Sequence, residues 1–295
     1  MNVIVTIPAY NEAKTIGILI NRIKTVMQKG RYKYKILVVD DCSKDKTAKV
    51  AKESGAVVYS HPKNYGLAET FRTEIEKSLQ LNADAIVHID ADLQYKPEEI
   101  PNLIREIENG YDLVLGSRFK GKIESMPWVN RLGNIAFSKV VSQMAGMKIS
   151  DAQTGFRAFT KNFAKKIVIR SDHTYTQEQI IRAAKNKFKI KEIPVYFAKR
   201  DGKSRLISNP FTYALRAWVN ILRIYRDYRP LKFFGIIGTL IFSIGFLIGL
   251  YMAYLHFTSG ISGHFSLVML DVLILSIGFQ LMIFALLADM PGKLE

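Results

Sequence analysis

The sequence predicts an α/β domain built on a parallel sheet, followed by a pair of membrane-spanning helices. Two observations support this prediction. Over roughly the first 120 residues, short apolar runs typical of strands alternate with segments whose apolar residues recur at helical spacing. Towards the end of the chain, two apolar runs are each long enough to cross a bilayer as a helix, at 233–257 and 267–288.

The alternating part contains five strand-like runs. They lie at 3–7, 36–39, 57–59, 86–89 and 113–116. The segments between them are predicted helices, which cover about 16–27, 45–54, 68–80 and 98–109. Strands that alternate with helices form a parallel sheet, and ligands of such sheets bind beyond the carboxyl ends of the strands. We therefore expect the binding site at that edge.

Polar residues gather after all five strand-like runs. The clusters are Pro8-Ala9-Tyr10-Asn11-Glu12, Asp40-Asp41-Cys42-Ser43, the loop with Asn64 and Gly66, Asp90-Ala91-Asp92, and Gly116-Ser117-Arg118. Loops are polar in most proteins, but the repeated carboxylates after the second and fourth runs favour a binding site over coincidence.

Two carboxylates one residue apart, Asp90 and Asp92, follow the fourth run, and Gln94 comes two residues later. Alternate residues of an extended chain point to the same side, about 7 Å apart, and a turn can bring them to one cation. Hard cations such as Mg²⁺ prefer carboxylate oxygens and keep positions open for phosphates. The pattern predicts a Mg²⁺ or Mn²⁺ site made by Asp90, Asp92 and Gln94.

Charge and hydropathy predict the topology. The formal net charge is +16, and nine Lys or Arg residues lie at 199–232, whereas the loop 258–264 has none. The positive-inside rule predicts that the loop lies outside the cell and that the preceding domain lies on the cytoplasmic side of the cell membrane. The basic charge next to membrane spans favours an anionic membrane or phosphorylated substrates over nucleic acid. Two core helices of a soluble protein are the less favoured alternative.

Four segments follow from these patterns. They are a catalytic domain at 1–206, an amphipathic interfacial helix at 207–230, two transmembrane helices at 231–289 and a tail at 290–295 that we interpret as a truncated or artificial end. The amphipathic helix carries aromatic and aliphatic residues on one face and arginines on another, which suits the headgroup layer. A helix packed on the catalytic domain is the alternative.

Six motifs occur in order along the chain. They are TIPAYNE (6–12), VVDDCSKDKT (38–47), IDADLQ (89–94), GSRF (116–119), DAQTGFRAF (151–159) and RDGKS (200–204). Together they resemble the family 2 glycosyltransferases, specifically the polyprenyl-phosphate glycosyltransferases, the group that includes dolichyl-phosphate mannose synthases. The resemblance covers about residues 3–206. It implies a Rossmann-like GT-A fold and metal-dependent transfer of a hexose from GDP-mannose or a UDP-hexose to a polyprenyl phosphate, with inversion.

The resemblance also implies which residues bind the donor. The nucleotide-sugar site would consist of Pro8, Tyr10, Glu12, Asp40, Asp41, Asp90, Ala91 and Asp92. Asp40 would lie near the base, and Asp90 against the ribose or the metal-bound diphosphate. Asp92 and Gln94 would hold the metal. The expected catalytic residues are Asp92, Asp151 and Arg118.

The acceptor site is expected to be cationic. Its candidate residues are Arg118, Arg131 and Arg200 with the hydroxyls of Ser138 and Ser204, because the guanidinium fork matches phosphate oxygens. Asp151 is expected to orient hydroxyl groups instead of taking a proton, since a phosphate monoester is already ionised above its second pKa of about 6. In the alternative interpretation, Asp151 caps a turn and Arg157 pairs structurally.

Several interpretations stay open. Glu178 either touches the sugar or is simply a helix residue, and His88 is predicted to be a core histidine. Position 67 is a leucine, whereas many members of the family have a lysine there. Two other functions are considered: a processive polysaccharide synthase, although Ala183 replaces the tryptophan of its motif, and a non-catalytic membrane-bound sugar-nucleotide-binding protein. The donor, the polyprenol (dolichyl or undecaprenyl) and the oligomeric state are left undetermined.

Overall fold

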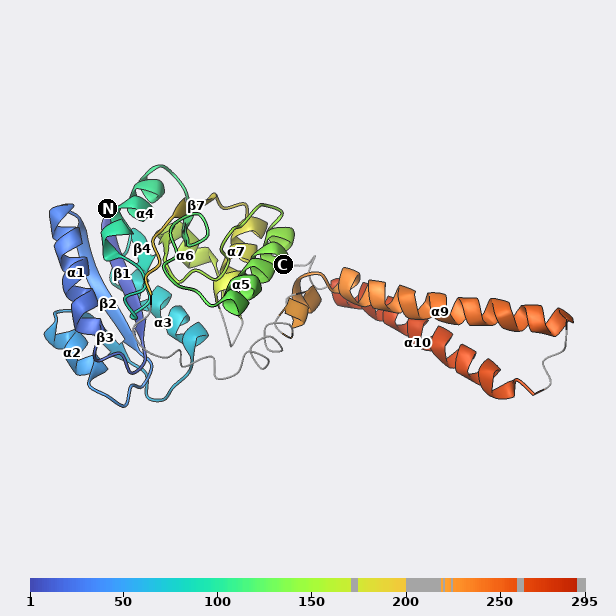
Figure 1. Ribbon diagram of the computed structural model, residues 1–295. Helices are drawn as coiled ribbons and strands as arrows, with labels where there is room; N and C mark the ends of the chain where they lie inside the picture. The colour runs from blue at the N-terminus through green and yellow to red at the C-terminus, as the bar shows by residue number, and fades with distance from the viewer. Residues whose placement is uncertain (171–174, 200–218, 220, 224, 259–262, 291–295) are drawn as a thin grey trace. The chain divides into compact units, whose positions relative to one another are not determined.

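The computed structural model describes residues 1–170, 175–199, 219, 221–223, 225–258 and 263–290 (Figure 1). The chain divides into two compact units, Met1–Pro210 and Phe211–Glu295. The predicted residues Arg200 and Ser204, much of the predicted amphipathic helix and almost all of the tail lie outside the described residues. Residues 219, 221–223 and 225–228 of that predicted helix are helical.

The first unit contains a seven-stranded sheet with the strand order β3-β2-β1-β4-β6-β5-β7. The strands are β1 Asn2–Ala9, β2 Lys33–Asp40, β3 Val57–Ser60, β4 Ala85–His88, β5 Leu113–Ser117, β6 Arg157–Thr160 and β7 Ile190–Pro194. All five predicted strands are confirmed. The expectation of a purely parallel sheet is wrong, because β6 pairs antiparallel with both β4 and β5. The remaining neighbours are parallel.

Helices connect and cover these strands (Figure 1). They are α1 Ile16–Lys29, α2 Thr47–Glu53, α3 Leu67–Gln80, α4 Ile100–Glu108, α5 Trp128–Ala145, α6 Lys161–Lys166 and α7 Thr176–Lys185. The alternating residues Val3, Val5 and Ile7 of β1 join α1 and α4 in one hydrophobic core. Thr6, on the opposite face of β1, contacts Glu74 of α3. The period of two in β1 thus divides the helices between the two faces.

A fully buried arginine organises the region around β6. Arg157 donates hydrogen bonds of 2.8 to 3.0 Å to the carbonyls of Ala152, Thr154 and Thr176 and to the side chain of Gln179. Burial lowers the pKa of Arg157. These bonds tie the loop before β6 to the start of α7, so Arg157 has the structural role that the alternative interpretation gave it.

The second unit contains two antiparallel apolar helices, α9 Pro230–Thr258 and α10 Phe265–Asp289, both long and apolar enough to cross a membrane. Their buried residues recur every seven positions, at Gly238, Gly245 and Met252 on α9 and at Asp271, Gly278 and Ala285 on α10. A Cβ at Gly278 would lie only 2.5 Å from the backbone nitrogen of Phe242. Glycine therefore lets the two backbones approach closely, as in many membrane helix pairs.

We expect the substitution Arg157→Met to destabilise the first unit severely. It leaves three carbonyls and one amide oxygen without their donor, and each buried polar group without a partner costs about 1–3 kcal/mol. The apparent Tm of the purified protein should fall by roughly 5–10 °C or more. Arg105→Met, at an exposed position of α4, is the control and should change the Tm little. Equal Tm values for the two variants would contradict the structural role of Arg157.

Candidate functional site

A cavity of about 410 Å³ lies at the carboxyl ends of β1, β2 and β4. Its lining residues are Pro8, Ala9, Tyr10, Glu12, Asp41, Asn64, Gly66, Leu67, Thr70, Asp90, Ala91 and Asp92. Seven of the eight residues predicted to bind the donor are thus brought together in one cavity. Asp40 is absent from the lining: its side chain is buried, and its carboxylate accepts a long hydrogen bond from the backbone of Ser43.

The loops after β1 and β2 are joined to each other beside this cavity. The backbone nitrogen of Asn11 donates to Ser43 Oγ (2.8 Å), and that of Lys44 donates to Asn11 Oδ1 (2.7 Å). The backbone nitrogen of Glu12 donates to Thr47 Oγ1 (2.8 Å). Asn11 has a φ of 55°, a conformation that asparagine tolerates better than most residues. These bonds fix the backbone on both sides of the lining residue Tyr10.

Asp41 organises the next loop of the cavity wall. Its carboxylate accepts hydrogen bonds of 2.8 Å from the backbone nitrogens of Tyr65 and Gly66, and it contacts His61 Nδ1 at 2.8 Å. Gly66 has a φ of +87°, which favours glycine, and α3 begins at the next residue, Leu67. Asp41 therefore fixes the position of the loop that carries Asn64, Gly66 and Leu67 into the cavity.

The carboxylates of Asp90 and Asp92 line the same cavity. Asp92 Oδ1 accepts a hydrogen bond from the backbone nitrogen of Gln94 (3.1 Å), across Leu93 with a φ of 61°. The Gln94 side chain does not line the cavity, and its amide nitrogen donates to the carbonyl of Ala198 (3.1 Å). Asp90 and Asp92 thus place two carboxylates in the lining of one cavity, and carboxylate oxygens are the ligands that Mg²⁺ and Mn²⁺ prefer.

These residues fit a cation that is bound partly by its substrate. Among the described residues, no group of three or more His, Cys, Asp and Glu side chains is arranged to hold a metal. Two carboxylates leave coordination positions open, which is how Mg²⁺ is bound when phosphate oxygens complete its shell. Of the two polar atoms of the Gln94 side chain, the oxygen is the one that could serve as a further ligand, because the nitrogen donates to the carbonyl of Ala198.

His88 is a buried core histidine, as predicted, and it lies next to Asp90. Its side chain is fully buried, and its two ring nitrogens contact Glu74 Oε2 and the hydroxyl of Tyr175, each at 2.6 Å. Burial alone would lower the pKa of His88, but the nearby carboxylates of Glu74 and Asp90 outweigh burial and raise it to about 9. His88 and Glu74 are in direct contact in the core.

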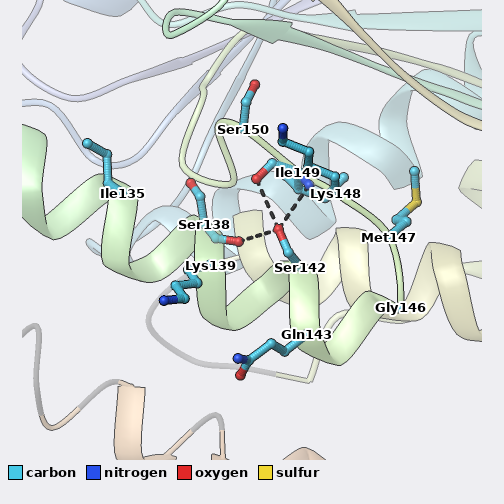
Figure 2. Close-up of a pocket in the computed structure, with 10 residues that line it drawn as sticks. All are labelled: Ile135, Ser138, Lys139, Ser142, Gln143, Gly146, Met147, Lys148, Ile149 and Ser150. Carbon is cyan, nitrogen blue, oxygen red and sulfur yellow. Dashed lines mark hydrogen bonds between the residues drawn. The ribbon is translucent and has the colours of Figure 1, made fainter.

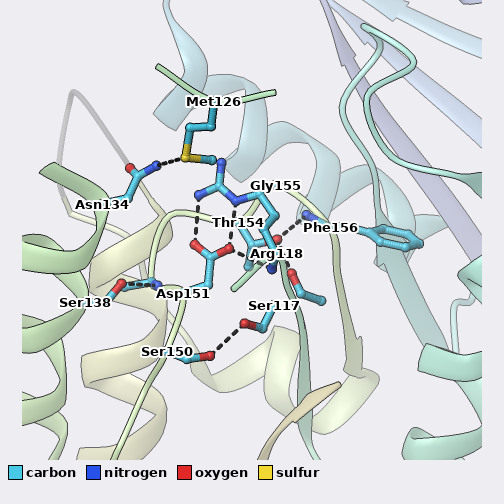
Figure 3. A network of polar contacts seen from close by, with 12 residues as sticks. Ser117, Arg118, Met126, Asn134, Ser138, Ser150, Asp151, Thr154, Gly155 and Phe156 are labelled. Carbon is cyan, nitrogen blue, oxygen red and sulfur yellow. Dashed lines mark hydrogen bonds and ion pairs between the residues drawn. The ribbon is translucent and has the colours of Figure 1, made fainter. Parts of the chain in front are cut away.

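Arg118 and Asp151 form a bidentate pair beside the carboxyl end of β5 (Figure 3). Arg118 Nε and Nη2 donate to the two Asp151 oxygens at 2.7 and 2.8 Å, and the Arg118 backbone nitrogen donates at 3.0 Å. Arg118 is only 8% exposed and Asp151 is fully buried. Although burial alone would lower the pKa of Arg118, it is raised by the neighbouring Tyr95, Asp151 and Asp90. Asp151 thus fixes the orientation of the guanidinium.

Tyr95 connects the segment that carries Asp90 and Asp92 to the loop that carries Asp151. Its buried hydroxyl lies 3.2 Å from Thr154 Oγ1 and accepts a hydrogen bond of 3.0 Å from the backbone nitrogen of Gly155. Thr154 Oγ1 donates in turn to the carbonyl of Gly116 (2.6 Å). Burial raises the pKa of Tyr95, so it stays a neutral phenol at physiological pH. The loop 151–156 is therefore bonded both to the end of β5 and to the segment after Asp92.

Residues 4–168, more than half of the chain, match the sequence profile described as glycosyl transferase family 2. This chain is a family 2 glycosyltransferase. The match contains the cavity, the two aspartates and the Arg118–Asp151 pair.

Two named relatives are similar over most of their length. A dolichyl-phosphate hexose transferase of Haloferax volcanii is 30% identical over 227 residues, which are 76% of this chain and 94% of the relative. A UDP-N-acetylglucosamine–dolichyl-phosphate N-acetylglucosaminyltransferase of Methanococcus voltae is 33% identical over 212 residues, 64% of this chain and 82% of the relative.

Solved structures confirm the GT-A fold of this glycosyltransferase. Glucosyl-3-phosphoglycerate synthase from Mycobacterium tuberculosis, solved with Mn²⁺, uridine diphosphate and phosphoglyceric acid, has a TM-score of 0.59 at 17% identity and covers 76% of this chain and 77% of its own. Mannosyl-3-phosphoglycerate synthase from Rubrobacter xylanophilus has a TM-score of 0.59 at 19% identity, with 77% and 74% covered.

The other predicted acceptor residues of the glycosyltransferase lie along α5. Arg131 is exposed there, whereas Ser138 is buried and its hydroxyl accepts a hydrogen bond from the backbone nitrogen of Ala152 (3.0 Å). Ser138 also lines a shallow groove of about 580 Å³ between α5 and the loop 146–150 (Figure 2). Ser138 thus touches the segment that carries Asp151, while Arg200 and Ser204 lie outside the described residues.

Glu178 of the glycosyltransferase has structural partners. It is buried, its carboxylate accepts hydrogen bonds from the backbone nitrogen of Arg170 (3.0 Å), and it pairs with Arg182 at 2.7 Å. Residues that the sequence reasoning missed include Thr70 on the cavity and Tyr95 and Thr154 beside it. The signals were present: Tyr95 directly follows the IDADLQ motif, and Thr154 is inside DAQTGFRAF.

We expect Arg118 and Asp151 to act as one unit. Arg118→Lys keeps the charge but loses the fork, and Asp151→Asn removes one of the two charges, so each should lower the rate of sugar transfer about 100-fold. The donor KM should change less than twofold. The double variant should be no slower than the worse single variant, because residues that share one contact have non-additive effects.

A double-variant cycle on the purified enzyme, with kcat and donor KM measured separately, checks this expectation. Losses that add in full would mean that the two residues have separate roles.

Proposed function

We propose that this glycosyltransferase transfers a hexose from GDP-mannose or a UDP-hexose to the phosphate of a polyprenol such as dolichol or undecaprenol. The observation that carries the proposal is the single cavity that gathers Asp90 and Asp92 with Tyr10, Glu12 and Asp41 at the carboxyl ends of three strands. Nucleotide ligands bind at this edge of open α/β sheets. The named relatives, which act on dolichyl phosphate, support the choice of acceptor.

For the donor, we propose that Asp90 and Asp92 hold a Mg²⁺ or Mn²⁺ ion, with Gln94 as a third ligand. The ion would stabilise the charge of the departing nucleoside diphosphate. The mycobacterial structure, which was solved with Mn²⁺ and uridine diphosphate, supports a divalent cation in general. Pro8, Tyr10 and Glu12 line the space for the nucleotide. Asp41 acts on it through the loop that it holds.

For the acceptor, we propose a phosphate site formed by Arg118, Arg131, Arg200, Ser138 and Ser204. Because Asp151 accepts hydrogen bonds from Nε and Nη2 of Arg118 and compensates its charge, Arg118 would contact the acceptor phosphate through its remaining N–H groups. Donors that are fixed before the reaction need no reorganisation during it.

The proposed reaction is a single displacement. A phosphate oxygen of the acceptor attacks the anomeric carbon, and the bond from that carbon to the diphosphate oxygen breaks. The nucleoside diphosphate leaves with the electron pair, so the configuration of the carbon inverts. The attacking phosphate is ionised above its second pKa of about 6, so no proton has to be removed. Asp151 then orients Arg118, because its buried carboxylate accepts hydrogen bonds from the guanidinium with both oxygens.

We further propose that the enzyme resides in the cell membrane with its catalytic unit on the cytoplasmic side. The two apolar helices suit a membrane position. Arg223, Arg226, Arg229 and Lys232 precede or begin the first helix, whereas no Lys or Arg lies between the two helices. Basic residues next to a span favour the cytoplasmic side.

A transfer assay tests the proposed function directly. The purified protein is incubated with Mn²⁺ or Mg²⁺, a short polyprenyl phosphate and, in turn, GDP-mannose, UDP-glucose and UDP-N-acetylglucosamine. We expect a lipid product from one donor, identified by its mass. Asp92→Asn or removal of the metal with EDTA should lower its yield at least 100-fold, because the leaving diphosphate loses its counter-charge.

Asp227→Asn is the matched control, since Asp227 is exposed and pairs with its neighbour Arg226. It should keep the activity. Nucleotide release without any lipid product would contradict the proposed acceptor.

The pH dependence of Asp151→Asn tests whether Asp151 takes a proton. We expect the variant to be slower at every pH with an unchanged profile, whose acidic limb follows the acceptor phosphate near pH 6. The measurement is kcat from pH 5 to 9, together with acceptor binding. A rate that recovers at high pH while acceptor binding stays normal would identify Asp151 as a general base.

A further inference from the structure

The Asp90 carboxylate is in contact with His88, a buried residue that has no role in the proposed reaction. His88, the last residue of β4, is fully buried, and its Nε2 atom lies 3.8 Å from Asp90 Oδ1. The two residues are two positions apart, and alternate residues of an extended chain project to the same side. The imidazole therefore faces the carboxylate that lines the donor cavity.

The imidazole is itself locked in place. His88 Nδ1 lies 2.6 Å from Glu74 Oε2, and Nε2 lies 2.6 Å from the Tyr175 hydroxyl. Thr6 donates to the same Glu74 oxygen (3.2 Å). The Tyr175 ring stacks on Phe71 with ring centroids 3.8 Å apart. Contacts from β1, α3 and the start of α7 therefore prevent His88 from turning away from Asp90.

The Asp90 carboxylate also lies against the backbone of Gly155. A Cβ atom at Gly155 would lie 1.9 Å from Asp90 Oδ2 and 2.5 Å from Asp90 Cγ. Any side chain at position 155 would therefore displace the carboxylate. Gly155 is held in turn through its backbone nitrogen, which donates to the buried hydroxyl of Tyr95. The Asp90 carboxylate is thus contacted both by His88 and by Gly155.

The contact between Glu74 and His88 contributes little to the stability of the core. Glu74 of α3 and His88 of β4 place two polar side chains in contact inside the core, and Glu74 Oε1 is buried without a hydrogen-bond partner among the described residues. A buried polar atom without a partner costs about 1–3 kcal/mol. The pair is therefore better explained by what it does to Asp90 than by packing.

We infer that His88 is a positioning residue that, together with Glu74 and Gly155, holds the Asp90 carboxylate in the orientation that binds the divalent cation. This inference rests on the cation site of the proposed function and is independent of the sugar and of the acceptor. Groups that orient a metal ligand commonly affect metal affinity by 10- to 100-fold. We expect an effect of that size when His88 is replaced.

The test is the affinity of the full-length, detergent-solubilised protein for Mn²⁺, measured by electron paramagnetic resonance. UDP or GDP is included, whichever gives the tighter complex. His88→Leu should raise the Kd of Mn²⁺ at least 10-fold. His88→Gln, whose amide can replace the Nε2 atom, should recover part of that loss. Gly155→Ala should weaken binding as well, because it displaces Asp90.

Phe163→Leu is the control for a general loss of stability. Phe163 is fully buried in α6 and packs against Phe159 and Phe188, so this variant should lower the Tm and leave the Kd of Mn²⁺ unchanged. Asp90→Asn and Asp92→Asn serve as references that should abolish binding.

The Mn²⁺ affinities of these variants decide whether His88 positions Asp90. If the aspartate variants lose Mn²⁺ while His88→Leu and Gly155→Ala bind it normally, the positioning role is wrong and the proposed function stands. If the aspartate variants also bind Mn²⁺ normally, the cation site itself is wrong, and the inference fails with it. If His88→Leu does not fold, His88→Gln decides: a normal affinity for Mn²⁺ overturns the inference, and a weaker affinity with an unchanged Tm supports it.

Discussion

The antiparallel insertion of β6 between β4 and β5 is the constraint on which the site depends. In this register Arg157, the first residue of β6, lies opposite His88, the last residue of β4. Because the two strands run in opposite directions, the residues just before β6 arrive at the carboxyl end of β4. A parallel strand in the same place would bring its following residues there instead. The loop 151–156 therefore lies beside Asp90 although it is some 60 residues away in the chain.

That one register accounts for the main contacts of the site. Gly155 lies against Asp90, Tyr95 bonds to the loop, and Asp151 reaches Arg118 at the end of β5. The buried guanidinium of Arg157 then holds the loop by its carbonyls. The donor cavity and the Arg118–Asp151 pair are thus two parts of one hydrogen-bonded framework, and a change in the loop should be felt by both.

The sequence predicted well what depends on neighbours along the chain. Strands β1 to β5 were recognised from apolar runs, and seven of the eight donor residues line one cavity because each directly follows such a run. Strand β6 was missed because it has four residues with an arginine at its start, which gives no apolar run. Without β6, the sheet was expected to be parallel throughout.

Contacts between distant segments were beyond the sequence. The pairing of Arg118 with Asp151 joins residues 33 apart, and the bond from Gln94 to Ala198 joins residues 104 apart. No periodicity or spacing encodes such distances, because they depend on the order of strands in the sheet. The burial of Asp40 is a similar case: its position at a strand end was recognised, but the direction of its side chain is set by the turn that follows.

The close packing of α9 against α10 at Gly238 and Gly278, here called the glycine seam, limits how a lipid-linked sugar could cross the membrane. Where Gly278 meets Phe242, even a methyl group would be too large, and Gly238 is nearly as close to Gly278. A hexose is far larger than a methyl group, so this pair of helices offers no passage for a sugar headgroup between them. A lipid-linked sugar made on one side of the membrane would therefore reach the other side by a route that does not run through this seam.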